Sequence, residues 1–206
     1  MAYCDWGKKD EINLKYHDEE WGVPLFDDQK QFEFLMMEAM QCGLSWSIVL
    51  HKREILRNCF DQFNVNAIAS YRETDVERIL STEGMIHSQS KIEAVISNAC
   101  CVQQIQKESG SFSSWLWSWT CGKVILYEGH EKGYIPASNA LSSSISRDLK
   151  KRGFRYLGPV TIYSHLQACG IINDHSETCT RRKELMEQYP WEIRQPEGEK
   201  NVRKFL

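Results

Sequence analysis

Four residues with metal-binding side chains lie near the two ends of this 206-residue sequence: Cys4 and His17 near the start, His175 and Cys179 near the end. The last two are four residues apart, a spacing that puts both side chains on one face of a helix or tight turn. Two nitrogens and two sulfurs fill a tetrahedral zinc site and leave no position for water, so a shared metal would be structural. It would also join segments separated by most of the chain. Spacing alone does not distinguish this metal site from four unrelated residues.

The composition predicts a globular intracellular protein. The length suits one well-cored domain or two small lobes, and 42% of the residues are hydrophobic. The first 21 residues contain acidic groups and no apolar core segment, which predicts no targeting signal and a cytoplasmic location. In the cytoplasm, the eight cysteines are expected to be reduced thiols rather than four disulfides. The net charge of −3 weakly disfavours a nucleic acid partner, although a local basic patch can outweigh the overall charge.

The spacing of apolar residues predicts a mainly helical protein. Apolar residues recur at helical spacing in residues 28–41, where Asp27 or Asp28 is available as the N-terminal cap. No segment shows the polar and apolar alternation of a half-buried strand. The charged stretch after about residue 181 is expected to be a tail. Further helices are predicted over residues 46–56, 65–70, 75–80, 90–105, 138–151, 159–169 and 182–188.

A glycine-bracketed turn, residues 153–158, separates the helices predicted over 138–151 and 159–169. Glycines let backbone amides approach a phosphate at the start of the second helix. Five basic residues against one acid give this region a local charge of +4. The pattern suits a helix-hairpin-helix that binds DNA, and an ordinary helical hairpin with a solvated basic face has the same pattern. The charged residues are Arg147, Asp148, Lys150, Lys151, Arg152 and Arg155.

Glu38 lies among apolar residues of a predicted helix. An unpartnered buried carboxylate is costly, and a flipped, positively charged nucleobase would supply both hydrogen-bond donors and charge. The rings of Tyr16, Trp21 and Trp46 would then face the base. The alternative is that these aromatic residues belong to the core and that Glu38 is a surface acid.

Four strings in order along the chain resemble the DNA-3-methyladenine glycosylase I family: YHDEEWG at 16–22, GLSW at 43–46, KKRGFRYLGP at 150–159 and LQACGIINDH at 166–175. The resemblance implies an all-α fold of the helix-hairpin-helix DNA glycosylase superfamily, with a zinc site that joins the N- and C-terminal regions. It implies a helical glycosylase domain over residues 1–180, with the helix-hairpin-helix at about 138–170. The tail would comprise residues 181–206.

The same resemblance implies a monofunctional enzyme of base excision repair, which flips N3-methyladenine out of alkylated double-stranded DNA and hydrolyses the N-glycosidic bond. Glu38 would be the catalytic residue, and Tyr16, Trp21 and Trp46 would bind the base. A structural zinc ion would be held by Cys4, His17, His175 and Cys179. We expect no nucleotide cofactor, no membrane partner and a monomer. The implied DNA contacts are Lys91, Lys151, Arg152, Gly153, Arg155 and Gly158.

Two features depart from the expected pattern. Asn173 stands where relatives in the superfamily carry an aspartate, and it cannot act as a base. Residues 87–90, His-Ser-Gln-Ser, replace a segment that is usually rich in arginine. Both motivate an alternative function, a catalytically weak lesion-binding repair protein with a structural zinc. A zinc hydrolase is disfavoured because four protein ligands leave no open position on the metal.

Overall fold

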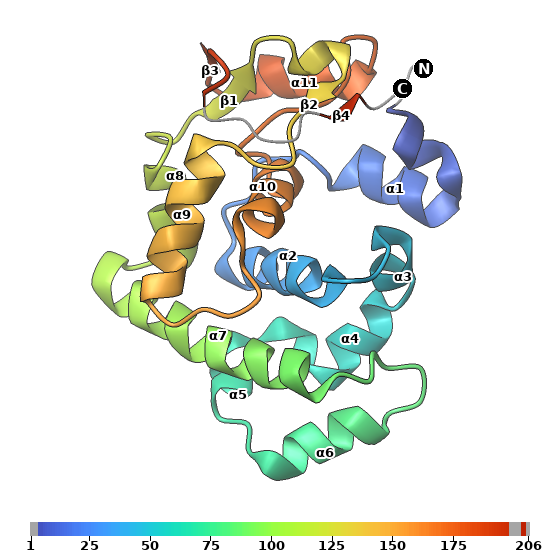
Figure 1. Cartoon of the computed structure of the whole chain (residues 1–206), viewed down its shortest axis with the longest axis vertical. Helices are drawn as coiled ribbons and strands as arrows, with labels where there is room; N and C mark the ends of the chain where they lie inside the picture. The colour runs from blue at the N-terminus through green and yellow to red at the C-terminus, as the bar shows by residue number, and fades with distance from the viewer. Residues whose placement is uncertain (1–3, 198–202, 205–206) are drawn as a thin grey trace. The chain divides into compact units, whose positions relative to one another are not determined.

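The computed structural model describes residues 4–197 and 203–204, which form helices and a few short strands (Figure 1). The chain divides into two compact units. Unit 1 comprises residues 1–25, 116–146 and 158–206, and unit 2 comprises residues 26–115 and 147–157. Helices α8 (Phe112–Ser118) and α9 (Ala140–Lys151) run from one unit into the other.

Among its described residues, the regular secondary structure of unit 2 is all helical. Its helix α2 begins where the Asp27 carboxylate accepts a hydrogen bond from the Lys30 N–H, and residues 31–40 of this helix are all buried. A helix that is buried on every face is a core helix. The predicted helix over 28–41 and its Asp27 cap are confirmed. The elements of unit 2 are α2 (Asp28–Gln41), α3 (Trp46–His51), α4 (Arg53–Cys59), η2 (Asp61–Phe63), α5 (Val65–Ala69), α6 (Glu73–Ser81) and α7 (Gln89–Ser109), with α7 packed against α5.

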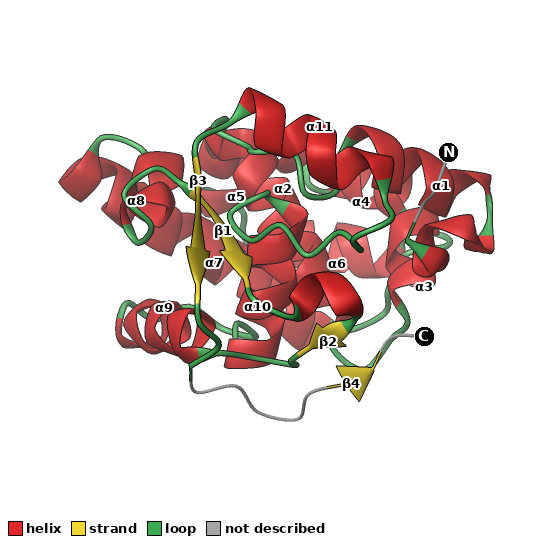
Figure 2. Ribbon diagram, turned by 90° about the horizontal axis from the view of Figure 1, so that it is seen from above, coloured by secondary structure: helices red, strands yellow, loops and turns green. Residues whose placement is uncertain are grey.

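Unit 1 combines helices with four short strands. Strands β1 and β3 pair in parallel, with Val124 opposite Trp191 and Tyr127 opposite Arg194, and β2 and β4 pair antiparallel (Figure 2). Its elements are η1 (Asp5–Lys9), α1 (Glu11–Glu19), β1 (Val124–Tyr127), η3 (His130–Lys132), β2 (Tyr134–Ile135), α10 (Pro159–Ala168), α11 (Thr180–Gln188), β3 (Trp191–Arg194) and β4 (Arg203–Lys204).

Two predictions about secondary structure are corrected. The fold is mostly helical, as expected, but it also contains short strands, so all-α is too narrow. Strand β1 is buried along its whole length and therefore reads in the sequence as a continuous apolar run rather than an alternating one. The helix predicted over 46–56 is interrupted at Lys52, whose φ of −93° and ψ of 5° separate α3 from α4. The helices predicted over 138–151 and 159–169 are observed as α9 and α10.

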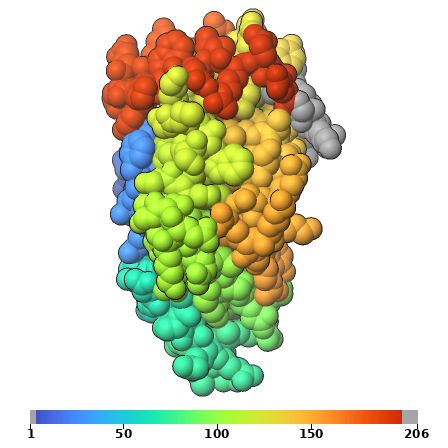
Figure 3. Space-filling model, turned by 90° about the vertical axis from the view of Figure 1, so that its left-hand side faces the viewer, coloured from blue at the N-terminus to red at the C-terminus, as the bar shows by residue number. Residues whose placement is uncertain are grey.

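Part of the stretch expected to form a tail is folded into α11, β3 and β4. The red residues of the space-filling view include α11 and β3, and β3 pairs with β1 (Figure 3). The eight cysteines all lie in the described part of the chain, and none of them forms a disulfide there. In the part of the chain that the structure describes, no helix is both long and apolar enough to cross a membrane.

Candidate functional site

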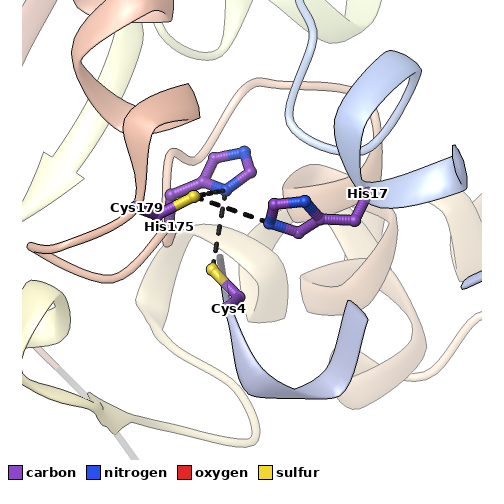
Figure 4. Close-up of side chains that lie close together, drawn as sticks. All are labelled: Cys4, His17, His175 and Cys179. Carbon is purple, nitrogen blue, oxygen red and sulfur yellow. Dashed lines mark hydrogen bonds between the residues drawn. The ribbon is translucent and has the colours of Figure 1, made fainter. Parts of the chain in front are cut away.

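Unit 1 brings together the four predicted metal ligands, which are all buried and lie with their ligand atoms within 4.8 Å of one another (Figure 4). The His175 Nδ1 atom is 3.6 Å from the Cys4 Sγ atom and 3.5 Å from the Cys179 Sγ atom. The Cys179 Sγ atom is 3.6 Å from His17 Nε2. In a tetrahedral zinc site, ordinary Zn–S and Zn–N bonds place neighbouring sulfur and nitrogen ligands about 3.5 Å apart. The donor set and its spacing therefore fit zinc, and the reading as four unrelated residues is wrong.

Hydrogen bonds on the outer side of the two imidazoles orient them. His17 Nδ1 lies 2.7 Å from the Asp18 carboxylate, and His175 Nε2 lies 3.2 Å from the carbonyl oxygen of Trp21. If these outer nitrogens carry the protons, His17 Nε2 and His175 Nδ1 present lone pairs to the cluster. Each imidazole thus has the tautomer and direction that a metal ligand requires.

Each of the two thiols shifts the pKa of the other. A hydrogen bond from Cys4 and bonds to the two histidines lower the pKa of the Cys179 thiol, despite its burial. The pKa of Cys4 is raised by the bond to Cys179 and by burial. A divalent cation stabilises thiolates, so its binding would favour the deprotonated form of both cysteines.

Gly22 permits the close approach of the N-terminal segment to the metal ligands. Its φ is +78°, and a Cβ atom at this position would lie only 2.7 Å from His175 Nε2. Since side chains rarely tolerate such a φ or such a contact, glycine is required where the Trp21–Gly22 backbone passes the imidazole.

An aromatic cluster in unit 1 packs against the ligands. The Trp21 ring meets the His175 ring edge-on at 4.6 Å between centroids, and Trp6 lies 5.0 Å from Trp21 and 6.3 Å from Tyr16. Tyr16 is buried and Trp21 is half-buried. Trp6 was not among the predicted site residues, and its position two residues after Cys4 was the available signal.

Unit 2 carries Glu38 in the last turn of α2 and Trp46 at the start of α3. The Glu38 side chain is buried, with 5% of the residue exposed, so the reading as a surface acid is wrong. Among residues 4–197 and 203–204, nothing donates a hydrogen bond to its carboxyl group or pairs with its charge. Burial raises the pKa of Glu38 from 4.5 to about 8. Trp46 is half-buried, and Ser45 caps its helix by accepting a hydrogen bond from the Ile48 N–H.

The basic turn after α9 is a regular helix end. The N–H of Gly153 donates to the Lys150 carbonyl and that of Phe154 donates to the Leu149 carbonyl, the Schellman pattern, with Gly153 at a φ of +93°. Lys151 is exposed, and Gly158 is exposed at the N-cap of α10, where Pro159 is the first helical residue.

The predicted DNA-contacting cations differ in their surroundings. The Arg152 guanidinium pairs with Asp148 at 2.7 Å and with Glu108 at 2.5 Å. Arg155 is exposed, and its guanidinium lies 4.0 Å from the carboxylate of Glu93, a longer and weaker pairing. Lys91 is half-buried, and its ammonium donates to two backbone carbonyls at the end of α2.

The segment before His175 holds two polar residues in structural contacts. Asn173 is buried, and its side-chain oxygen accepts a hydrogen bond from the His175 N–H. The buried Asp174 carboxylate accepts hydrogen bonds from the Tyr163 hydroxyl at 2.6 Å and from the Gln167 amide at 2.8 Å, and lies 2.8 Å from His130 Nδ1. Asp174 is therefore fully engaged within unit 1.

Comparison with known proteins gives a consistent result. A family model described as methyladenine glycosylase matches residues 6–182. The chain is 40% identical over 179 residues to DNA-3-methyladenine glycosylase 1 of Escherichia coli (strain K12), which covers 87% of this chain and 96% of that protein. A crystal structure of 3-methyladenine DNA glycosylase I matches with a TM-score of 0.82 at 42% identity, covering 87% of this chain and 98% of the other. A structure describing 3-methyladenine recognition by 3-methyladenine DNA glycosylase I from Staphylococcus aureus matches with a TM-score of 0.83 at 34% identity, covering 88% and 97%.

Proposed function

Because the chain belongs to the methyladenine glycosylase family, we propose that it flips N3-methyladenine out of alkylated double-stranded DNA and hydrolyses the N-glycosidic bond. The observation that supports this most directly is the buried Glu38 carboxyl group, which lacks a partner among the described residues and has a pKa of about 8. In such surroundings the group either keeps its proton or ionises against a bound cation. N3-methyladenine in DNA is such a cation.

The chemistry of the substrate explains the residue types. Methylation at N3 gives adenine a positive charge, which weakens the glycosidic bond and lets the base depart as a neutral molecule, so little acid catalysis is needed. The Glu38 carboxylate accepts hydrogen bonds from the amino edge and stabilises the charged base, and Trp46 stacks on the ring. Tyr16 and Trp21 supply the further aromatic contacts. Unmethylated adenine lacks the charge and is bound less well.

Hydrolysis in this proposal relies on the instability of the substrate. Asn173 is uncharged and holds the His175 backbone, and Asp174 is occupied by three side chains. Water therefore attacks the sugar carbon without help from either residue. No lysine is assigned as a nucleophile, so the reaction ends at an abasic site.

DNA is held, in this proposal, by the turn after α9 and by the start of α10, as in a helix-hairpin-helix. Lys151 and Arg155 contact phosphates, while Gly153 and Gly158 let the backbone approach them. Arg152 contributes mainly by stabilising the turn, because its guanidinium already pairs with two carboxylates of the protein itself, those of Asp148 and Glu108.

A structural zinc ion completes the proposal, held by Cys4, His17, His175 and Cys179. When bound, it joins η1 and α1 to the segment before α11 and takes no part in the reaction. Cys4→Ser and Cys179→Ser should each lose zinc in metal analysis and unfold at lower temperature. A kinetic defect with full zinc content would contradict this role.

Incubation with methylated duplex DNA, followed by chromatography of the released bases, tests the activity. The wild-type protein should release 3-methyladenine, and Glu38→Gln should slow single-turnover release by about a hundredfold or more. A protein that binds the lesion but releases no base at any enzyme concentration would instead be a lesion-binding repair protein.

A further inference from the structure

Lys91 satisfies the C-terminal end of the helix that carries Glu38. Its Nζ atom donates hydrogen bonds to the carbonyl oxygens of Met40, at 2.8 Å, and Cys42, at 2.5 Å. The last carbonyls of a helix lack partners within the helix and form the negative end of its dipole. The last turn of α2 has no basic residue of its own. Lys91, which lies on α7, supplies both the missing donors and the missing charge.

The two carbonyl groups lie at the C-terminal end of α2, close in sequence to Glu38 and Trp46. Glu38 is in the same helical turn as Met40, and Cys42 begins the short turn that leads to Trp46. Fixing both carbonyls from one ammonium group therefore fixes the end of α2 and the start of that turn together. Two of the three ammonium donors are used in this way, which disfavours a phosphate as the main partner of Lys91.

Asn98 lies seven residues after Lys91 on the same face of α7, and its side chain forms hydrogen bonds with the backbone of the basic turn. Its buried side chain accepts a hydrogen bond from the Arg155 N–H at 2.8 Å and donates to the Arg155 carbonyl at 3.1 Å. Near the start of α7, the Ser90 hydroxyl lies 2.9 Å from the Tyr156 hydroxyl. One face of α7 thus holds the end of α2 through Lys91 and the basic turn through Asn98.

We propose that Lys91 is a positioning residue for base recognition, which sets the Glu38 carboxyl group and the Trp46 ring by holding the end of α2, and that it is not a phosphate contact. This inference rests on the proposed function, since it assumes that Glu38 and Trp46 bind the base. It gives Lys91 a role separate from that of Lys151 and Arg155.

The test measures two affinities for three variants. Lys91→Met should weaken binding of free 3-methyladenine about tenfold, as followed by tryptophan fluorescence, because two helix-end carbonyls lose their donor. The dependence of duplex DNA affinity on salt should keep the wild-type slope. Lys91→Arg, which can donate to both carbonyls, should restore most of the base affinity. Asn98→Ala is the matched control, and it should weaken DNA binding while leaving base affinity within about twofold.

The outcomes separate the inference from the function on which it rests. Wild-type protein that does not bind 3-methyladenine would end the proposed function itself. If wild type binds the base, unchanged base affinity in Lys91→Met together with a salt slope reduced by about one would make Lys91 a phosphate contact and overturn the inference. Equal loss of base affinity in Asn98→Ala would also overturn it, because the effect would then be general loosening.

A measurement on the wild-type protein keeps the test valid if Lys91→Met does not fold. Amine acetylation followed by peptide mass spectrometry should find Lys91 slow to react with and without DNA. The exposed Lys151 should react quickly and become protected by DNA. Rapid reaction of Lys91 that DNA suppresses would contradict the positioning role.

Discussion

The Nε2 atom of His175 lies 3.2 Å from the carbonyl oxygen of Trp21, so a hydrogen bond joins a proposed metal ligand near the end of the sequence to an aromatic residue near its beginning. The Trp21 ring also packs edge-on against the same imidazole. Under the proposed function, the metal would influence base recognition through Trp21 and its neighbours, by fixing their positions. This arrangement makes the metal site a support for the aromatic cluster.

Gly22→Ala should disrupt this support. The new Cβ atom would meet His175 Nε2 at 2.7 Å and would stand at a φ of +78°. Gly122→Ala is the control, because Gly122 has a φ of +75° but no atom within 4 Å of the added Cβ. Both variants bear the backbone strain of about 1 kcal/mol, and only Gly22→Ala should also lose zinc to a chelator at lower concentrations than wild type. Equal zinc retention in the two variants would show that the contact is harmless.

Glu38 should make the stability of the protein depend on pH. Its pKa is about 8 in the folded protein, against an ordinary value of 4.5, so the folded state binds more protons than the unfolded state between these values. The free energy of unfolding should therefore fall as pH rises through this window. Relative to Glu38→Gln, wild type should lose about 1–3 kcal/mol between about pH 5 and about pH 9. Urea unfolding of both proteins across this range measures the difference, and parallel curves would mean that Glu38 is solvated.

How far the sequence predicts this structure depends on which residues are buried. Helix α2 was predictable because apolar residues repeat along it. Helix α1 was not, because its buried residues are Asn13, Tyr16 and His17, which have no apolar period. The pairing of β1 with β3 is parallel and joins residues far apart in sequence, which local patterns cannot reveal.

The same limit applies to the candidate site. The ligand types and the apolar setting of Glu38 are visible in the sequence, and the structure brings the four ligands together. The carbonyl partners of Lys91 and the Glu108 carboxylate beside Arg152 are far away in sequence, and only the fold brings them near. A basic residue in sequence therefore indicates a charge but not whether that charge is available to DNA.

Arg155 and Arg152 should differ when each is replaced by glutamine. Arg155 is exposed and pairs loosely with the Glu93 carboxylate at 4.0 Å, so Arg155→Gln should weaken duplex DNA binding and reduce the salt slope by about one, with little change in stability. Arg152 pairs with Asp148 and Glu108 and stacks over Trp115, so Arg152→Gln should cost about 1 kcal/mol of stability. Its salt slope should stay close to wild type. Binding isotherms at several salt concentrations and urea unfolding measure the two effects, and a reversed pattern would assign the phosphate contact to Arg152.

Asp28 should stabilise unit 2 at neutral pH but not in acid. Its carboxylate accepts hydrogen bonds from the Gln106 amide at 2.7 Å, the Ser111 hydroxyl at 2.7 Å, and the N–H groups of Phe112 at 2.9 Å and Ser113 at 2.8 Å. Burial alone would raise the pKa of Asp28, but these hydrogen bonds outweigh it and lower the pKa below 3.8. The stabilisation is therefore present above the unfolded-state pKa and lost as pH falls through the lower, folded-state value.

Asp28→Asn should accordingly destabilise the protein by about 2–3 kcal/mol at neutral pH, because an amide nitrogen would face groups that donate. The gap between variant and wild type in urea unfolding should narrow in acid, as the wild-type carboxylate becomes protonated. Glu77→Gln, at an exposed position of α6, serves as the control and should change little at either pH. A gap that stays constant down to acid pH would mean that the shape of the side chain matters here and its charge does not.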